Sequence, residues 1–167
     1  MASLVVTRRM EVGIAVVVVV LDQVTKAMVR KALPLHDSVE VVSGFLDLTR
    51  VHNTGAAFGM LNAADFPFKT VVLSLVALVA MSGAAWYAVS VPPGDRLARI
   101  GIAGVLGGAV GNLIDRATAG YVLDFVDAYW QGWHFWAFNV ADAAITVGVA
   151  FMILDFLGLG RRASNTL

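Results

Sequence analysis

The sequence predicts a membrane α-helical protein with four transmembrane helices and a small β-sheet region between the first and second helices. Of its 167 residues, 59% are hydrophobic and only 14% are charged, and the mean hydropathy is +0.78. Soluble domains carry about a quarter charged residues, so this composition favours the bilayer. Four long apolar segments can each cross about 30 Å of hydrocarbon, and one polar stretch has an alternating pattern. We expect a single integral membrane domain over residues 1–167.

The first apolar segment covers residues from about 10 to about 32 and follows Arg8 and Arg9. A basic start before a valine run also fits a cleavable signal peptide. However, no Ala-x-Ala-like cleavage site follows the run, and Asp22 and Lys26 continue the segment. These flanks favour a retained helix.

The polar stretch covers residues from about 34 to about 65 and alternates in residue type in two places. The runs Val39-Glu40-Val41 and 46–51 alternate, with Ser43-Gly44 between them. Alternation around a glycine turn predicts a β-hairpin or a small sheet. The stretch includes the small-residue run 53–59, which is suited to a close approach of the backbone.

The second and third predicted helices cover about residues 66–91 and about residues 97–116. The second stops at Pro92-Pro93-Gly94, which breaks a helix. In the third, Gly104 lies four residues before Gly108, and Gly107 lies four before Gly111, so both pairs form small faces for tight helix contact.

The fourth predicted helix covers about residues 135–159. We expect a loop between the third and fourth helices, and its aromatic residues favour the headgroup interface. They are Tyr121, Tyr129, Trp130, Trp133 and Trp136. Residues 130–136 are also a candidate gate, although anchoring in the interface explains the same aromatic residues.

Four crossings place both termini on one side of the membrane. Basic residues on the terminal side are Arg8, Arg9, Arg96, Arg99, Arg161 and Arg162, and those on the other side are Lys26, Arg30, Lys31, Arg50, Lys69 and Arg116. The two counts are equal. Discounting Lys26 and Arg116, which are embedded in helix ends, slightly favours cytoplasmic termini. The charges alone therefore do not fix the orientation.

Composition excludes several kinds of chemistry. The chain has no cysteine, so it has no disulfide, thiol nucleophile or cysteine metal site, and its formal net charge of +0 gives no nucleic-acid footprint. His36, His52 and His134 lack metal-ligand spacing, which favours loop or interface roles. No motif supports serine–lysine catalysis by Ser38 or Ser43 with a nearby lysine. We expect no metal and no cofactor.

Polar residues are expected to gather at one membrane face, where buried charges are costly. They are Asp22, Asn53, Asn112, Asp115, Arg116, Asp124, Asp127, Asn139 and Asp142. Taken singly, several have ordinary explanations: Asp22 and Lys26 are four apart and predict an intrahelical salt bridge. Asp115 next to Arg116 suggests an ion-pair member, and Asp142 at a helix start complements the helix dipole.

Together, two such aspartates can form a hydrolytic pair. Two carboxylates at low dielectric share a proton, because they cannot both ionise easily. The ionised member can draw a proton from water while the protonated member polarises a carbonyl group. Residue types and spacing do not select which two aspartates form the pair.

Five ordered motifs carry a resemblance to a known family over nearly the whole chain. They are Asp22-Gln23-x-x-Lys26, Asn53-Thr54-Gly55-Ala56-Ala57-Phe58, Gly108-x-x-Gly111-Asn112-x-x-Asp115-Arg116, Val122-x-Asp124-Phe125 and Phe138-Asn139-x-Ala141-Asp142. This set resembles the lipoprotein signal peptidases (prolipoprotein signal peptidase, signal peptidase II). The resemblance implies that Asp124 and Asp142 are the catalytic dyad. The supporting or substrate-binding residues that match are Asp22, Lys26, Asn53, Gly108, Asn112, Arg116, Asn139 and Ala141.

The resemblance also implies a function and a location. The expected protein is an intramembrane aspartic endopeptidase that removes signal peptides from diacylglyceryl-modified prolipoproteins, cutting just before the lipidated cysteine. Its expected partners are these substrates and membrane lipid, with no obligate protein partner. It is expected to span the bacterial cytoplasmic (inner) membrane several times, with cytoplasmic termini, an extracytoplasmic β-sheet cradle and an active site near that face.

Two other classes of protein remain as alternatives. A small proton-coupled transporter could use Asp22, Asp124 and Asp142 as a proton relay. Carriers usually show internal repeats, and the two halves of this chain show no self-similarity. A non-enzymatic scaffold could use the glycine faces, but it would not need so many polar residues at one level.

Overall fold

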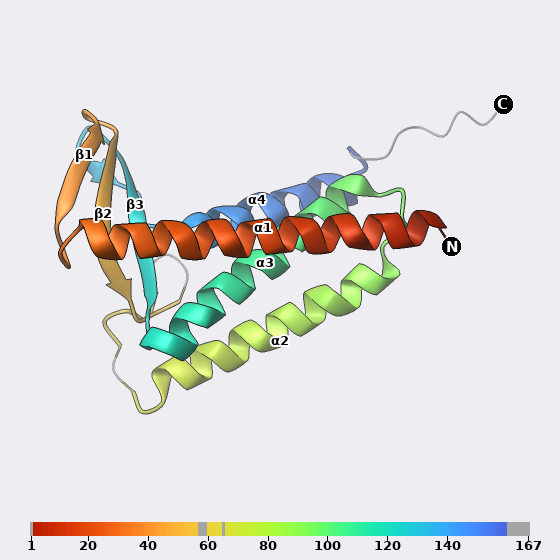
Figure 1. The fold of residues 1–167 in the computed structure, drawn as a ribbon, viewed down its shortest axis with the longest axis horizontal. Helices are drawn as coiled ribbons and strands as arrows, with labels where there is room; N and C mark the ends of the chain where they lie inside the picture. The colour runs from red at the N-terminus through yellow and green to blue at the C-terminus, as the bar shows by residue number, and fades with distance from the viewer. Residues whose placement is uncertain (1, 57–59, 65, 160–167) are drawn as a thin grey trace.

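The computed structural model describes residues 2–56, 60–64 and 66–159, with side chains from residue 8 onward. Within these described residues, four helices and four strands follow one another (Figure 1). Their order is α1 (Ala2–Ala32), β1 (Ser38–Val42), β2 (Leu46–Asn53), α2 (Lys69–Ser90), α3 (Arg96–Ala119), β3 (Val122–Trp130), β4 (Trp133–His134) and α4 (Val140–Phe156).

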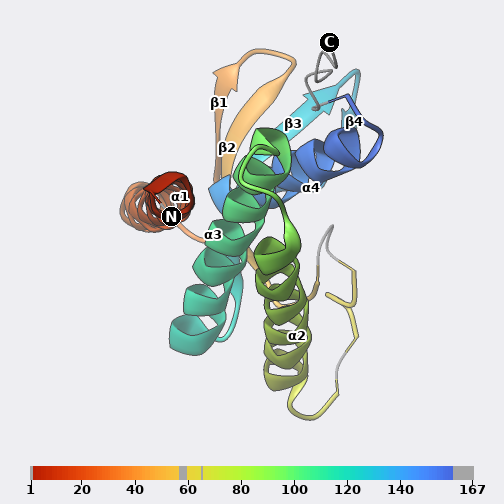
Figure 2. The same cartoon turned by 90° about the vertical axis from the view of Figure 1, so that its right-hand side faces the viewer.

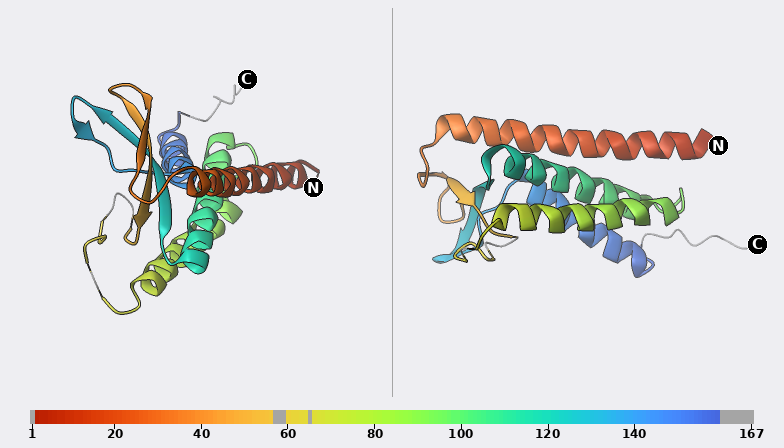
Figure 3. Two further views of the ribbon diagram at one scale, coloured as in Figure 1. Left: turned by 60° about the vertical axis from the view of Figure 1, so that its left-hand side comes forward. Right: turned by 90° about the horizontal axis from the view of Figure 1, so that it is seen from below.

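The helices lie lengthwise together, and the sheet lies beyond one end of them (Figures 1 and 3). α3 packs against α1, α2 and α4, so it is the central helix. Figure 2 shows α2 set apart from α1. The start of α1, the α2–α3 connection and the end of α4 lie at the end opposite the sheet.

Within the described residues, three helices are long and apolar enough to cross a membrane: Arg8–Ala32, Lys69–Ser90 and Arg96–Ala119. The first begins earlier than the predicted residue 10, because α1 is helical from Ala2. The fourth predicted segment, 135–159, is too long, since α4 has 17 residues and begins only at Val140. The reason is the cap that Asn139 forms at its N-terminus.

The two predicted glycine faces of α3 are confirmed as close helix contacts. A Cβ atom at Gly104 would lie 3.1 Å from the Ala144 carbonyl oxygen of α4, and one at Gly108 would overlap the Ala141 carbonyl oxygen. On the other face, a Cβ at Gly107 would lie 2.8 Å from the Ala15 carbonyl oxygen of α1. Because these glycines have no side chain, α1 and α4 can approach the α3 backbone closely.

The sheet is antiparallel, with strand order β1-β2-β3-β4. The β1–β2 hairpin, Ser38–Val42 with Leu46–Asn53, confirms the hairpin predicted within residues 34–65, of which 57–59 and 65 lie outside the described residues. The loop predicted between the third and fourth helices is wrong, because Val122–Trp130 forms β3 and pairs with β2. The sheet therefore combines segments from between α1 and α2 and from between α3 and α4. In this register Asp124 lies opposite Val51.

A small apolar core joins the sheet to the end of α1. Its buried members are Val29 of α1 with Leu123 and Phe125 of β3. Leu123 and Phe125 flank Asp124 in sequence, so this core fixes the backbone on both sides of that aspartate. The junction between helices and sheet is thus the rigid frame of the polar site.

Candidate active site

Lys26 is the most buried cation of the site. Its Nζ lies 2.8 Å from Asp22 Oδ2, 2.9 Å from Asp115 Oδ2 and 3.0 Å from Asn112 Oδ1. An ammonium group has three N–H donors, so these three acceptors satisfy it completely. The Lys26 and Asp22 side chains are 0% exposed. The predicted Asp22–Lys26 salt bridge is confirmed, and it is part of a larger network that includes Asp115 and Asn112.

Asp115 is an ion-pair member, as predicted, but its partners come from another helix. Its carboxylate binds Lys26 and also Arg30, whose Nη2 lies 2.9 Å from Asp115 Oδ1. It also accepts a hydrogen bond from the Leu123 backbone N–H at 3.0 Å. The neighbouring Arg116 instead donates to the Gly55 carbonyl at 3.1 Å. Asp115 therefore joins α1, α3 and β3.

Asp142 lies in the first turn of α4 and forms a capping box with Asn139. The Asp142 backbone N–H donates to Asn139 Oδ1 at 2.9 Å, and the Asn139 N–H donates to Asp142 Oδ2 at 3.3 Å. This position near the positive end of the helix dipole is the one expected from the sequence. The second carboxylate oxygen, Oδ1, accepts from Asn112 Nδ2 at 2.8 Å.

Asp124 lies on β3 and is only 2% exposed. Asn139 Nδ2 donates to its Oδ1 at 2.7 Å, and Asn53 Nδ2 donates to its Oδ2 at 3.0 Å. Burial, together with the charge of Asp142, raises the pKa of Asp124 to about 7. The Asp124 carboxyl group can therefore exchange a proton near neutral pH.

The asparagines join the two parts of the site into one network. Asn139 Nδ2 lies within hydrogen-bond distance of Asn112 Oδ1, at 3.3 Å, and Asn112 in turn accepts from Lys26. A continuous polar path thus runs from Lys26 through Asn112 and Asn139 to both aspartates. Most of the polar residues expected at one membrane face are joined by these hydrogen bonds and ion pairs. They are Asp22, Asn53, Asn112, Asp115, Asp124, Asn139 and Asp142.

The small residues of the site have backbone roles. Ala141 donates its N–H to Asp22 Oδ1 at 3.0 Å. Gly108 leaves the space that the Ala141 carbonyl occupies. These two positions therefore let α1, α3 and α4 meet at the level of the carboxylates.

Asp127 does not join this network. It pairs with His134 of β4, whose Nδ1 lies 2.9 Å from Asp127 Oδ2. Within the part of the chain that the structure describes, no group of three or more His, Cys, Asp or Glu residues is placed to hold a metal ion. The site therefore contains the Asp124 and Asp142 carboxyl groups, each held by asparagine donors, and the pKa of Asp124 is near neutral. The Lys26 cation is fixed in the same network.

Sequence reasoning missed two polar contacts that hold the helices. Gln23 donates from Nε2 to both Asp22 Oδ2, at 3.0 Å, and the Gly111 carbonyl, at 3.1 Å. At the opposite end, buried Arg99 pairs with Glu11 and donates to the Pro92 carbonyl at 2.9 Å. In the sequence, Arg99 contributes only to the count of basic residues on each side of the membrane. No local spacing connects it to Glu11, which is on another helix.

Solved structures share this architecture. One described as a bacterial membrane enzyme matches with a TM-score of 0.81 and 30% identity, over 95% of this chain and 93% of its own. A second with the same description has a TM-score of 0.78 and 28% identity, over 89% of this chain and 92% of its own. The fold and its buried polar network define a bacterial membrane enzyme built from helices and a small antiparallel sheet.

Sequence similarity gives the family. A family model described as signal peptidase (SPase) II matches residues 14–158. The lipoprotein signal peptidase of Symbiobacterium thermophilum is 41% identical over 155 residues, 93% of this chain and 99% of that protein. That of Syntrophotalea carbinolica is 45% identical over 143 residues, 84% and 86% of the two chains. The chain belongs to the signal peptidase II family. The transporter alternative finds no support in these similarities.

Proposed function

We propose that this protein is an intramembrane aspartic endopeptidase that removes the signal peptide from diacylglyceryl-modified prolipoproteins. The proposed cut lies just before the lipidated cysteine. The observation that carries the proposal is that Asn139 contacts both Asp124 and Asp142, while the pKa of Asp124 is raised to about 7. The family membership and the names of the relatives supply the substrate class.

In the proposed mechanism, a water molecule is held between Asp124 and Asp142. The ionised aspartate takes a proton from this water as its oxygen attacks the scissile carbonyl carbon. The protonated aspartate donates its proton to the carbonyl oxygen. When the tetrahedral intermediate collapses, the C–N bond breaks and a proton goes to the leaving amine. General acid–base help of this kind contributes about 10²–10⁴-fold in rate.

The proposed supporting residues act by position. Asn53, Asn112 and Asn139 each donate to a carboxyl oxygen of the pair, so each holds that carboxyl group in a fixed direction. Arg116 would bind a substrate carbonyl beside the pair, next to its contact with the Gly55 carbonyl. We assign Asp22 and Lys26 to structural support rather than proton transfer, because Lys26 is fully satisfied and buried.

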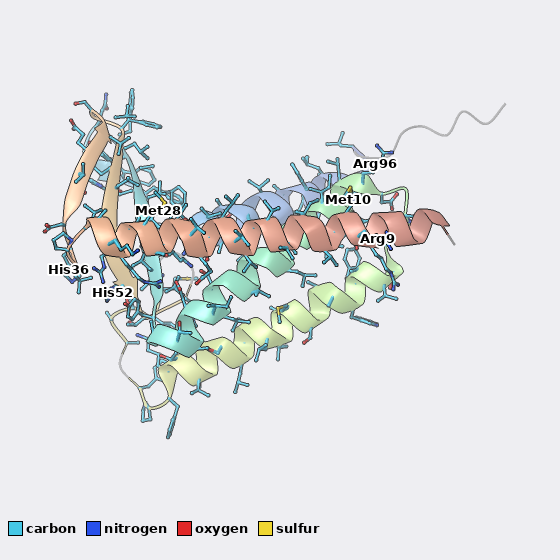
Figure 4. The ribbon with its side chains drawn as sticks, viewed as in Figure 1. Arg9, Met10, Met28, His36, His52 and Arg96 are labelled. Atoms are coloured by element: carbon cyan, nitrogen blue, oxygen red, sulfur yellow. The ribbon has the colours of Figure 1, made fainter. Side chains whose placement is uncertain are left out.

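We also propose that α4 is a fourth crossing and that both termini are cytoplasmic. A helix of 17 residues is about 26 Å long, close to the thickness of the hydrocarbon core. Figure 4 places Arg9 and Arg96 at the end opposite His36 and His52. We assign that end to the cytoplasm, because the basic residues are slightly in excess there once Lys26 and Arg116, which are embedded in helix ends, are discounted. The active site would then lie near the extracytoplasmic face, and the signal helix would enter laterally from lipid with its acyl chains against the apolar helices.

The test is cleavage of a defined prolipoprotein by the purified protein in detergent. One substrate carries the diacylglyceryl cysteine, and the control is the same polypeptide without lipid. We expect cleavage of the lipidated substrate only, with mass spectrometry placing the new N-terminus at the modified cysteine. Equal cleavage of both forms, or a cut at another bond, would contradict the proposed specificity.

A further inference from the structure

Lys69 occupies a position that its own helix does not favour. It is the first residue of α2, where the positive end of the helix dipole repels a cation. The first turn of α2 has no acidic residue, and the N-cap residue Phe68 makes no side-chain capping bond. The reason for a half-buried lysine here must therefore lie outside the helix.

The Lys69 ammonium group binds the segment that follows β2. Its Nζ donates to Thr54 Oγ1 at 3.2 Å, to the Asn62 carbonyl at 3.1 Å and to the Ala64 carbonyl at 2.8 Å. These are three acceptors for three N–H donors. Because Thr54 is distant in sequence from Asn62 and Ala64, Lys69 fixes the two ends of this segment relative to each other.

The same segment carries Asn53, which contacts Asp124. Thr54 follows Asn53 directly, and its backbone N–H and Oγ1 both donate to Asn62 Oδ1, at 3.1 and 2.8 Å. The Gly55 N–H donates to Asn53 Oδ1 at 2.8 Å, which leaves Asn53 Nδ2 directed to Asp124 Oδ2 at 3.0 Å. The orientation of the Asn53 amide thus depends on the residues that Lys69 holds.

Residue 70 connects the start of α2 to the other side of the site. Thr70 Oγ1 donates to the Gly120 carbonyl at 3.0 Å. Gly120 ends α3 and comes shortly before β3, the strand that carries Asp124. The start of α2 is therefore fixed to the Asp124 side through Thr70 and to the Asn53 side through Lys69.

We propose that Lys69 is a positioning residue for the reaction, holding the Asn53 amide against Asp124 through its contacts with Thr54, Asn62 and Ala64. This inference rests on the function proposed above. The Asn53 hydrogen bond favours the ionised form of Asp124. The charged groups that act on Asp124 are Asp142 from α4, Lys26 from α1 and Arg116 from α3, and none of them contacts Lys69. Loss of the Lys69 contacts should therefore raise the proton affinity of Asp124.

The experiment compares Lys69→Met with three other variants in the lipidated-substrate assay across pH. Lys69→Arg restores the donors. Thr54→Val removes the hydroxyl contacts with Lys69 and Asn62 without a change in charge, and Lys31→Met removes an exposed lysine at the same end. We expect Lys69→Met to lower kcat/KM by about 10–100-fold and to move the alkaline limb of the profile to higher pH. Lys69→Arg should recover part of both effects, Thr54→Val should give a smaller shift in the same direction, and Lys31→Met should match wild type.

A second measurement separates this inference from the proposed function. The pH dependence of Tm reports the ionisation of Asp124 without substrate. Suppose that the wild-type protein cannot cleave the substrate, but that Lys69→Met moves the pH dependence of Tm to higher pH. That result would support the positioning role of Lys69 and contradict the proposed function. Suppose instead that the wild-type protein cleaves the substrate, while Lys69→Met leaves the pH profile of kcat/KM unshifted or only lowers Tm. Either result would overturn the positioning role of Lys69 and leave the proposed function standing.

Discussion

The side-chain amide of Asn139 donates to Asp124 Oδ1 at 2.7 Å. The other end of the same amide accepts from the Asp142 backbone N–H at 2.9 Å and caps α4. One side chain therefore starts a helix and sets the direction of a carboxylate on a neighbouring strand. The two aspartates are held relative to each other by a local helix cap and one long-range hydrogen bond.

Substitutions of Asn139 should separate these two roles. Asn139→Ala removes both, and loss of an N-cap should lower stability by about 1 kcal/mol. Asn139→Ser keeps a capping oxygen but loses the amide donor to Asp124, so its Tm should fall less than that of Asn139→Ala. Both should reduce cleavage, by about 10–100-fold. Thermal unfolding and initial rates measure the two effects, and a Ser variant with wild-type activity would show that the Asp124 contact is dispensable.

Lys26 should be required for folding. It is fully buried between Asp22 and Asp115, so Lys26→Met leaves buried Asp22 without its cation and leaves Asp115 with Arg30 alone. Breaking a buried ion pair in this way costs about 3–5 kcal/mol. We expect a large fall in Tm in detergent, while Lys31→Met, which changes an exposed lysine of the same helix, leaves Tm unchanged. Similar Tm values for the two variants would contradict the structural role of Lys26.

Gly108 should tolerate no side chain. A Cβ there would overlap the Ala141 carbonyl and lie 2.8 Å from Ile145 Cγ1, so Gly108→Ala must push α4 from α3. Overpacking of this kind costs about 1–3 kcal/mol, and it should also move Asp142 away from Asn112 and reduce cleavage. The matched control is Gly83→Ala in α2, where nothing lies within 4 Å. That control should keep activity and gain up to about 1 kcal/mol from helix propensity, as measured by Tm.

The raised pKa of Asp124 predicts how stability changes with pH. Its pKa in the folded protein is about 7, against an ordinary value of 3.8. Protonated Asp124 therefore contributes stability that is fully present below the ordinary value and is lost as pH rises through about 7. Asp142→Asn removes the neighbouring charge, which lowers the pKa of Asp124.

The fall in Tm between about pH 5 and about pH 8 should consequently be smaller in Asp142→Asn than in wild type. Asp127→Asn is the control, because Asp127 pairs with His134 outside the network. If the two variants follow the same pH dependence, the charge of Asp142 does not act on Asp124.

Local spacing predicted the features that depend on one helix or one hairpin. The Asp22–Lys26 pair, the glycine faces of α3 and the β1–β2 hairpin follow from periods of four and two residues, and all three are present. The start of α4 could also have been found, because Asn139 and Asp142 have the spacing of a capping box.

Long-range pairing accounts for what the sequence alone did not predict. β3 was expected to be a loop, because its aromatic residues suggested the interface and its partner, β2, lies far away in the chain. Asp115 was placed beside Arg116, whereas it pairs with Lys26 and Arg30 of α1. Such contacts depend on which helices meet, and no local pattern of residues gives that information.

The most direct test of the proposed catalytic pair compares three aspartate variants in one cleavage assay. Asp124→Asn and Asp142→Asn each neutralise one member of the pair, and Asp127→Asn changes another aspartate of β3. With the lipidated prolipoprotein as substrate and Tm as the folding control, we expect no measurable cleavage from the first two and wild-type cleavage from the third. Retained activity in a folded Asp124→Asn or Asp142→Asn protein would contradict the proposal that these two carboxylates carry the hydrolysis.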